Sequence, residues 1–184
     1  MDTYQIKLIG TNQVIYLSEA TQEDIEAVSS ILTFDWLNFW SRLDPDCEAI
    51  IKLESQGKIQ GLTHIALYPY PLGNNKPEYL EIIALEATQP PHRTVQPIGY
   101  YLIWYATKIS LEFGCTGNDD NSIVELYSLE PIVDYYRDKV RMEGRGSITL
   151  SPSEDGYAFR FSKAQAIEFC DRTEQRYGIP SRVG

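Results

Sequence analysis

The chain has few cysteines, and their spacing matches no familiar kind of site. Among 184 residues there are three, Cys47, Cys115 and Cys170, which are far apart and odd in number. Such a set fits neither a disulfide framework nor the paired cysteines of a metal knuckle. We therefore expect no metal site and a reducing, cytoplasmic setting.

Long apolar runs are also missing. No stretch approaches the ~18 apolar residues needed to cross a bilayer. The first residues, MDTYQIKLIG, lack the basic region and the apolar core of a signal peptide. The sequence therefore predicts no association with a membrane.

Positive charge is in deficit. The chain carries 16 Lys and Arg against 26 Asp and Glu, a formal net charge of −10. Such a charge repels a phosphate backbone, so we expect no nucleic-acid partner. The negative charge would favour binding of a positively charged acceptor molecule, although acidic surfaces usually serve only to keep proteins soluble.

Several catalytic signatures are absent. The sequence contains no G-x-S-x-G, no Walker A motif and no H-E-x-x-H, which argues against a hydrolase or a nucleotide-binding enzyme. It also lacks G-x-G-x-x-G, and its strand–helix units do not repeat, so a Rossmann fold is excluded.

What is present is an ordinary globular composition with one informative stretch. Hydrophobic residues make up 43% and charged residues 23%, which suits a single domain over residues 1–184. The apolar run at 79–87 predicts a central strand buried on both faces. A polar loop with a Pro-Pro pair follows, and the period becomes helical from Ile98, with Gly114 placed as a C-cap. Backbone N–H groups come together where a strand and a short loop lead into a helix that begins near a glycine. Such a place can bind an anion.

The remaining elements follow from periodicity, caps and turn residues. We expect strands at 4–9, 14–17, 47–54, 59–68, 122–128, 147–151 and 157–161, and helices at 18–32, 34–43, 98–113, 131–140 and 163–177. The stripe of the central helix is Ile98, Leu102, Tyr105, Ile109 and Phe113, and that of the helix at 131–140 is Ile132, Val133, Tyr136 and Val140. This order predicts an α/β (α+β) sandwich whose mixed sheet has one parallel crossover. The aromatic helix at 34–43 either packs in the core against the sheet or forms, together with the helix at 18–32, the wall of a pocket for an acceptor molecule.

The loop before the central helix carries a family resemblance. It reads Thr94-Val95-Gln96-Pro97-Ile98-Gly99, with Leu102 in the helix, and it resembles the Gln/Arg-x-x-Gly-x-Gly/Ala loop of the GNAT superfamily of N-acetyltransferases. Arg93 stands one place before the expected basic residue. Pro97 replaces a glycine and has no N–H to offer a pyrophosphate, whereas Gln96, Ile98, Gly99 and Tyr100 keep theirs.

Two further residues extend the resemblance. The segment Pro131 to Tyr136 is similar to a family helix whose tyrosine protonates the coenzyme A thiolate, and Tyr136 takes that place, although the usual Gly-Phe is missing. Glu81 stands where some members have the glutamate that deprotonates the amine. Glu86 has odd parity relative to Glu81, so the two face opposite sides of a regular strand unless a bulge intervenes.

The resemblance implies a fold and a reaction. The fold would be a mostly antiparallel mixed sheet flanked by helices, with an extra C-terminal helix. The pyrophosphate of acetyl-CoA would lie at residues 93–100, and its pantetheine arm alongside Leu85, Glu86 and Ala87. A small-molecule or peptide amine would attack the thioester directly, with Glu81 as base and Tyr136 as acid.

Each residue has a plainer reading beside the catalytic one. Glu81 could be a structural carboxylate, Tyr136 a core tyrosine and Arg93 a solvated loop residue, while His64 reads as a packed histidine. Pro97 and the missing Gly-Phe favour a competing hypothesis, a GNAT-fold module that binds acyl-CoA or a protein without turnover. A homodimer remains open, because the twofold dimer is the commonest closed assembly.

Overall fold

The computed structural model describes residues 1–69, 76–118, 121–152 and 154–183, so parts of the expected loops at 69–77 and 115–121 lie outside the described residues. Nine strands form one sheet in the order β7-β8-β6-β5-β4-β3-β2-β1-β9. Strands β5 and β6 pair in parallel, and the remaining ladders between described strands are antiparallel. The strands are β1 (Thr3–Lys7), β2 (Val14–Glu19), β3 (Glu48–Ser55), β4 (Lys58–Tyr68), β5 (Tyr79–Ala87), β6 (Ser122–Leu129), β7 (Glu143–Ser151), β8 (Glu154–Ser162) and β9 (Pro180–Val183).

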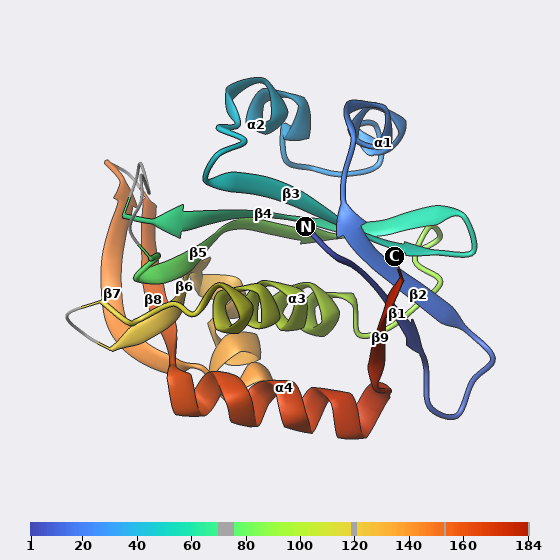
Figure 1. Cartoon of the computed structure of the whole chain (residues 1–184). Helices are drawn as coiled ribbons and strands as arrows, with labels where there is room; N and C mark the ends of the chain where they lie inside the picture. Colours follow the sequence, from blue (N-terminus) through green and yellow to red (C-terminus); the bar gives the residue numbers. More distant parts are fainter. Residues whose placement is uncertain (70–75, 119–120, 153, 184) are drawn as a thin grey trace.

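The helices cover both faces of this sheet. In Figure 1, α1 (Gln22–Val28) and α2 (Trp36–Arg42) lie on one face, and α3 (Ile98–Phe113) and α4 (Lys163–Tyr177) lie on the other. Helix α3 is sandwiched between the sheet and α4, which explains why it is buried almost all round. A 3₁₀ turn η1 (Glu130–Ile132) and a π-helical turn η2 (Tyr135–Val140) follow β6. The expected mostly antiparallel mixed sheet, flanked by helices and with an extra C-terminal helix, is confirmed.

Local sequence signals account for where the helices begin and end. Thr21 caps α1 and Ser162 caps α4, each in a reciprocal capping box with the residue three positions later. Gly114 ends α3 in the left-handed conformation, with φ 68°, where a residue with a Cβ is disfavoured. Helix α4 has the expected bounds.

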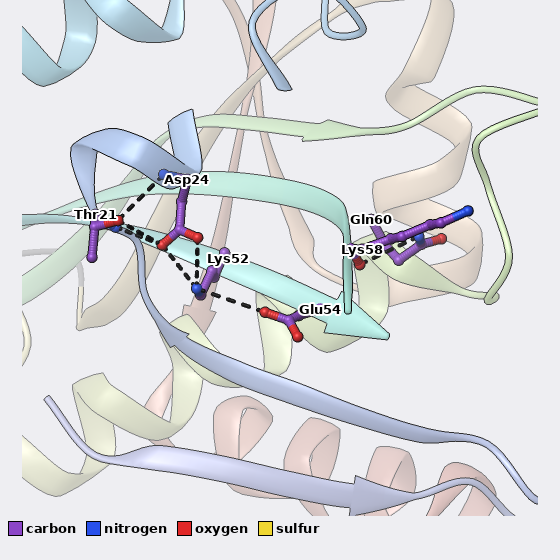
Figure 2. A network of polar contacts seen from close by, with 6 residues as sticks. All are labelled: Thr21, Asp24, Lys52, Glu54, Lys58 and Gln60. Atoms are coloured by element: carbon purple, nitrogen blue, oxygen red, sulfur yellow. Dashed lines mark hydrogen bonds and ion pairs between the residues drawn. The ribbon is translucent and has the colours of Figure 1, made fainter. Parts of the chain in front are cut away.

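The hydrophobic core has two parts, one on each face of the sheet. The larger cluster lies between the sheet, α3 and α4, and the smaller one joins Ile25 of α1 and Trp36 of α2 to the sheet. Figure 2 shows how polar contacts fasten α1: Lys52 of β3 donates to both carboxylate oxygens of Asp24 at 2.8 Å and lies 3.7 Å from Glu54.

Strand β5 differs from the expected strand buried on both faces. Its ladder with β4 steps from His64↔Ala84 to Ile65↔Ile82, which leaves Ile83 as an unpaired bulge residue that is 37% exposed. Leu80 and Ile82 pack toward α3, whereas Ala84 packs with α1 and α2. The bulge therefore shifts the alternation by one residue and turns Glu81 and Glu86 to the same face.

Three other expectations need correction. Phe113 and Ile132 were placed on buried stripes, but they are 48% and 47% exposed, because each lies at the end of its helical turn. The segment at 131–140 forms η1 and η2 and not one regular helix. Strand β9 was not predicted; α4 ends at Tyr177 with Gly178 as its C-cap, and β9 begins at Pro180 and pairs antiparallel with β1.

Candidate functional site

A pocket of about 390 Å³ opens where the end of β5, the loop at 88–97 and the start of α3 meet η1 and η2. We call it the strand–helix pocket. Seven of the eight residues expected to contact the cofactor line it, together with Tyr136: Leu85, Glu86, Ala87, Arg93, Gln96, Ile98 and Gly99. The eighth, Tyr100, has its side chain in a neighbouring pocket. Residues chosen from the sequence thus surround one cavity.

The N-terminus of α3 is open toward this pocket. Pro97 is its N-cap residue and no side chain caps the helix, so the backbone N–H groups of Ile98, Gly99 and Tyr100 have no capping side chain. Helix N-termini attract anions through these groups and through the helix dipole. The proline therefore removes one N–H outside the helix and leaves the first turn intact.

Gly61 of β4 lets α3 approach the sheet. A Cβ at residue 61 would lie 2.7 Å from the carbonyl oxygen of Glu86 and 2.7 Å from Cγ2 of Ile98. The first turn of α3 is consequently packed directly over β4 and β5, which fixes its N–H groups beside the end of β5.

Internal hydrogen bonds hold the loop. Arg93 donates through Nε to the carbonyl oxygen of Thr88 at 2.8 Å and through Nη2 to Oε1 of Gln89 at 3.1 Å. Gln60, which is fully buried and appears in Figure 2, accepts from the N–H of Thr94 at 2.7 Å. Part of the Arg93 guanidinium is therefore used within the loop, while its charge stays at the pocket edge.

Tyr136 connects the strand–helix pocket to a smaller one. Beyond the ladder of Leu80–Ile82 with Val124–Leu126, β5 and β6 pair no further. A cavity of about 90 Å³ lies there, and Tyr136 lines both cavities. Burial raises the pKa of Tyr136 to about 12, so its hydroxyl is protonated at neutral pH and can act as a proton donor.

Tyr135, the residue before, also lines the strand–helix pocket and was not singled out from the sequence. Its hydroxyl lies against Gly99, whose Cβ, if present, would be 2.7 Å from that oxygen. Its ring meets those of Tyr100 and Tyr136 edge to face, with centroids 5.8 and 5.3 Å apart. The adjacent tyrosines were the available signal, but only the fold shows that both reach the cavity.

Glu81 lies outside the strand–helix pocket. Because a strand rises ~3.3 Å per residue, it is ~13 Å along β5 from Leu85. It is paired in register with Glu125 of β6, and the Tyr68 and Tyr79 rings stack nearby with centroids 4.9 Å apart. Burial raises the pKa of Glu81, the charge of Glu125 adds to this, and a hydrogen bond from Tyr68 opposes it. The structure therefore places the expected base and the expected acid in separate surroundings.

The carboxylate of Glu86 points away from the expected pantetheine path. It accepts hydrogen bonds from the N–H groups of Thr33 and Phe34 at 2.6 and 3.0 Å and from Nε1 of Trp36 at 2.9 Å. The side chain thereby fixes the start of α2 against β5, and only its strand position borders the pocket.

His64 and Cys115 are both buried, and neither has surroundings that suit it to catalysis. His64 is buried against Phe39, with Nε2 3.0 Å from Oε2 of Glu48, and burial lowers its pKa. Burial raises the pKa of Cys115. Within the described ranges, no group of three or more His, Cys, Asp or Glu side chains is placed to hold a metal. Nor does that part of the chain contain a helix long and apolar enough to cross a membrane.

No protein-family model matches this sequence, and no curated protein is significantly similar to it. Solved structures are similar in fold. An uncharacterized protein of Bacillus halodurans superposes with a TM-score of 0.69 at 10% identity, covering 95% of this chain and 97% of that one.

Two named enzymes also match. The ribosomal-protein-alanine N-acetyltransferase of Brucella melitensis gives a TM-score of 0.55 at 13% identity over 79% of this chain and 98% of its own. Arabidopsis thaliana Naa50, solved with the bisubstrate analogue CoA-Ac-MVNAL, gives 0.54 at 14% identity over 80% and 98%. At these identities the similarity shows the fold: the chain has the fold of the GNAT acetyltransferases, as the sequence resemblance implied.

Proposed function

We propose that the protein is an acetyl-CoA-dependent N-acetyltransferase that acts on a primary amine. One observation carries the proposal. The end of β5, the uncapped N-terminus of α3 and the hydroxyl of Tyr136 converge on a single cavity of about 390 Å³. The fold supports it, because the similar structures include N-acetyltransferases, one of them with a CoA-containing analogue.

Different residues would bind the pyrophosphate and the pantetheine arm of acetyl-CoA. The N–H groups of Ile98, Gly99 and Tyr100 would hold the pyrophosphate of acetyl-CoA, with the Arg93 charge beside it. The free backbone edge of β5 beyond the bulge, at Leu85 to Ala87, would pair with the amides of the pantetheine arm, as an added strand does.

The transfer itself exchanges one bond for another. The amine nitrogen forms a bond to the acetyl carbonyl carbon, and the carbon–sulfur bond breaks. Glu81 takes the amine proton through water. Its pKa is raised toward neutral pH, which makes the carboxylate a better base. Tyr136 gives its proton to the departing sulfur. A backbone N–H of β5 stabilises the carbonyl oxygen.

The acceptor would be a cationic amine before it loses its proton. Glu81 and Glu125 lie side by side on the face covered by α1 and α2, and Tyr68 and Tyr79 stack beside them. Carboxylates next to aromatic rings favour an ammonium group over a neutral or acidic molecule. A small amine and the amino group of a peptide both satisfy this chemistry.

The test is release of free coenzyme A from acetyl-CoA in the presence of a panel of amines, comprising diamines, amino-acid amides, peptide N-termini and lysine peptides. We expect amine-dependent release, reduced ~100-fold by Tyr136→Phe, and reduced also by Glu81→Gln. Tyr16→Phe, at a 38% exposed tyrosine of β2, is the matched control and should not change the rate.

Binding of acetyl-CoA without turnover on any amine would favour the alternative, a non-catalytic acyl-CoA-binding module. Two observations are in its favour: Pro97 stands in the loop, and Glu81 lines neither of the two cavities that Tyr136 lines. Unchanged rates in both Tyr136→Phe and Glu81→Gln would remove these two residues from the mechanism.

A further inference from the structure

A second cavity, separate from the strand–helix pocket, has no part in the proposed transfer. It holds about 230 Å³ between the start of α3, the end of η2 and the second half of α4. We call it the basic pocket. Four of its lining residues are cationic, Lys139, Arg141, Arg172 and Arg176, against one carboxylate, Asp138. In a chain with a net charge of −10, such a concentration of positive charge is unusual.

The charges of this pocket are largely uncompensated. Asp138 is already paired with Arg137, its Oδ1 lying 2.9 Å from Nε of that exposed arginine. Arg172 reaches Glu168 only at 4.0 Å. In the described part of the chain, Lys139, Arg141 and Arg176 make no ion pair. The pocket therefore presents a net positive charge to whatever enters it.

A buried hydroxyl points to a ligand independently of the charges. Thr173 lines the pocket, is 4% exposed, and its Oγ1 has no hydrogen-bond partner among the described residues. A buried polar group without a partner is costly, and such groups in native proteins call for an explanation. This oxygen is itself shielded from solvent, so an anion would reach it by displacing a neighbouring side chain of the pocket and would then accept a hydrogen bond from this hydroxyl.

The backbone at Arg141 has an unusual conformation for an arginine. Arg141 ends η2 with φ 65°, a left-handed conformation in which glycine or asparagine is usual. Arg172 anchors the same turn from α4 by donating through Nη2 to the carbonyl oxygen of Val140 at 2.7 Å. Two arginines from different elements are thus brought to one cavity.

We infer that the basic pocket binds a phosphate monoester. Guanidinium groups bind phosphate through two parallel hydrogen bonds. The oxygens of a dianionic phosphate can be shared among several arginines, whereas a single carboxylate has only two oxygens to offer. Tyr100 and Tyr177, whose ring centroids are 5.8 Å apart, provide an apolar wall for the organic part of the ester. This inference goes beyond the proposed acetyl transfer.

The basic pocket is physically joined to the strand–helix pocket. Tyr100 lines the first and Tyr135 the second, and the two rings are in edge-to-face contact. Tyr100 also donates its hydroxyl hydrogen to the carbonyl oxygen of Lys139, in the turn that carries Tyr135 and Tyr136. The phosphate has two chemical sources that the structure accommodates: the phosphomonoester of a coenzyme A molecule bound next door, or a separate phosphorylated ligand.

The test is calorimetric titration with inorganic phosphate at constant ionic strength. Wild type should bind phosphate, and Arg141→Asn/Arg176→Gln should bind it at least ~10-fold more weakly, because each charged hydrogen bond is worth more than a neutral one. Asparagine tolerates the left-handed backbone of residue 141, so the variant should fold. Arg42→Gln/Lys7→Gln changes the net charge equally at exposed sites and should bind phosphate as wild type does.

Thr173→Val provides a second, milder variant that keeps the shape of the side chain. It should weaken phosphate binding ~5-fold. Phosphate binding that is absent in wild type, or equal in wild type and the double variant, would overturn the inference.

Repeating the titration with saturating ligand separates the two sources. If the coenzyme fills the basic pocket, coenzyme A abolishes phosphate binding and dephospho-coenzyme A does not. If the ligand is a separate molecule, phosphate still binds to the coenzyme A-loaded protein. Either result supports the inference. Failure of coenzyme A to bind at all would count against the proposed function alone, since the first titration contains no coenzyme.

Discussion

The hydroxyl of Tyr135 lies against the bare Cα of Gly99, so that a methyl group on residue 99 would be 2.7 Å from the hydroxyl oxygen and 3.4 Å from Cζ. Tyr135 cannot easily move away, because its ring is held by Tyr100 and Tyr136. The contact couples the first turn of α3 to η2 across the strand–helix pocket.

The first prediction concerns this contact. Gly99→Ala should lower the free energy of unfolding by about 1 to 3 kcal/mol through overpacking and should weaken binding of acetyl-CoA. In a Tyr135→Phe background the clashing oxygen is gone, and the same alanine should be almost neutral. Urea denaturation of the four proteins in this double-mutant cycle measures the coupling. An equal cost in both backgrounds would show that the hydroxyl does not set the constraint.

A second prediction concerns the close approach of α3 to β4. Gly61→Ala should cost about 2 to 4 kcal/mol, because its Cβ would meet the backbone oxygen of Glu86 as well as Ile98. Gly144→Ala in β7 is the control, since its Cβ would meet only Phe159, at an ordinary 3.8 Å. Chemical denaturation midpoints compare the two. Equal midpoints would contradict the packing argument.

The third prediction separates two roles for Glu86. Glu86→Ala should lower stability by about 2 to 3 kcal/mol, because the buried Nε1 of Trp36 loses its acceptor. Affinity for acetyl-CoA should stay close to that of wild type, since the carboxylate faces α2. Glu26→Ala, on the exposed side of α1, should change stability little. A large loss of cofactor affinity with unchanged stability would place the carboxylate in the binding site instead.

The fourth prediction is a pH dependence at Glu81. Burial, assisted by Glu125, raises the pKa of Glu81 in the folded protein, so folding favours the protonated form. Between the unfolded pKa, about 4.3, and the higher folded pKa, the folded state binds more protons than the unfolded state. This contribution to stability is therefore lost as the pH rises through the folded pKa.

Glu81→Gln removes that titration. The stability of the variant relative to wild type should increase with pH across this window and level off above the folded pKa. Urea midpoints at a series of pH values measure the difference. Parallel curves for the two proteins would mean that Glu81 titrates as an exposed glutamate does.

Much of the fold could be predicted from local signals. The capping box at Thr21, the left-handed Gly114 and the apolar run at 79–87 act through residues a few positions apart, so the end of α3 and β5 were expected where they lie. The helix expected at 18–32 is shorter in the structure: α1 spans Gln22–Val28, and Ser18 and Glu19 belong to β2. Strand β9 was missed because Pro180 reads as a helix terminator. Its partner, β1, is at the other end of the chain.

The candidate site was less accessible to sequence reasoning. The bulge at Ile83, which turns Glu86 toward α2, depends on how β4 pairs with β5 and leaves no mark in the sequence. Gly61 contacts the start of α3 from a strand far away in the chain. The basic pocket was invisible for the same reason, since Arg141 and Arg176 come together only in three dimensions.

The most direct test of the account is calorimetric titration of the purified protein with acetyl-CoA and then with coenzyme A. We expect both to bind in the micromolar range, because the N–H groups at the start of α3 remain available beside Pro97. Absence of binding up to millimolar concentrations would contradict it. The fold would then have been kept without its cofactor site.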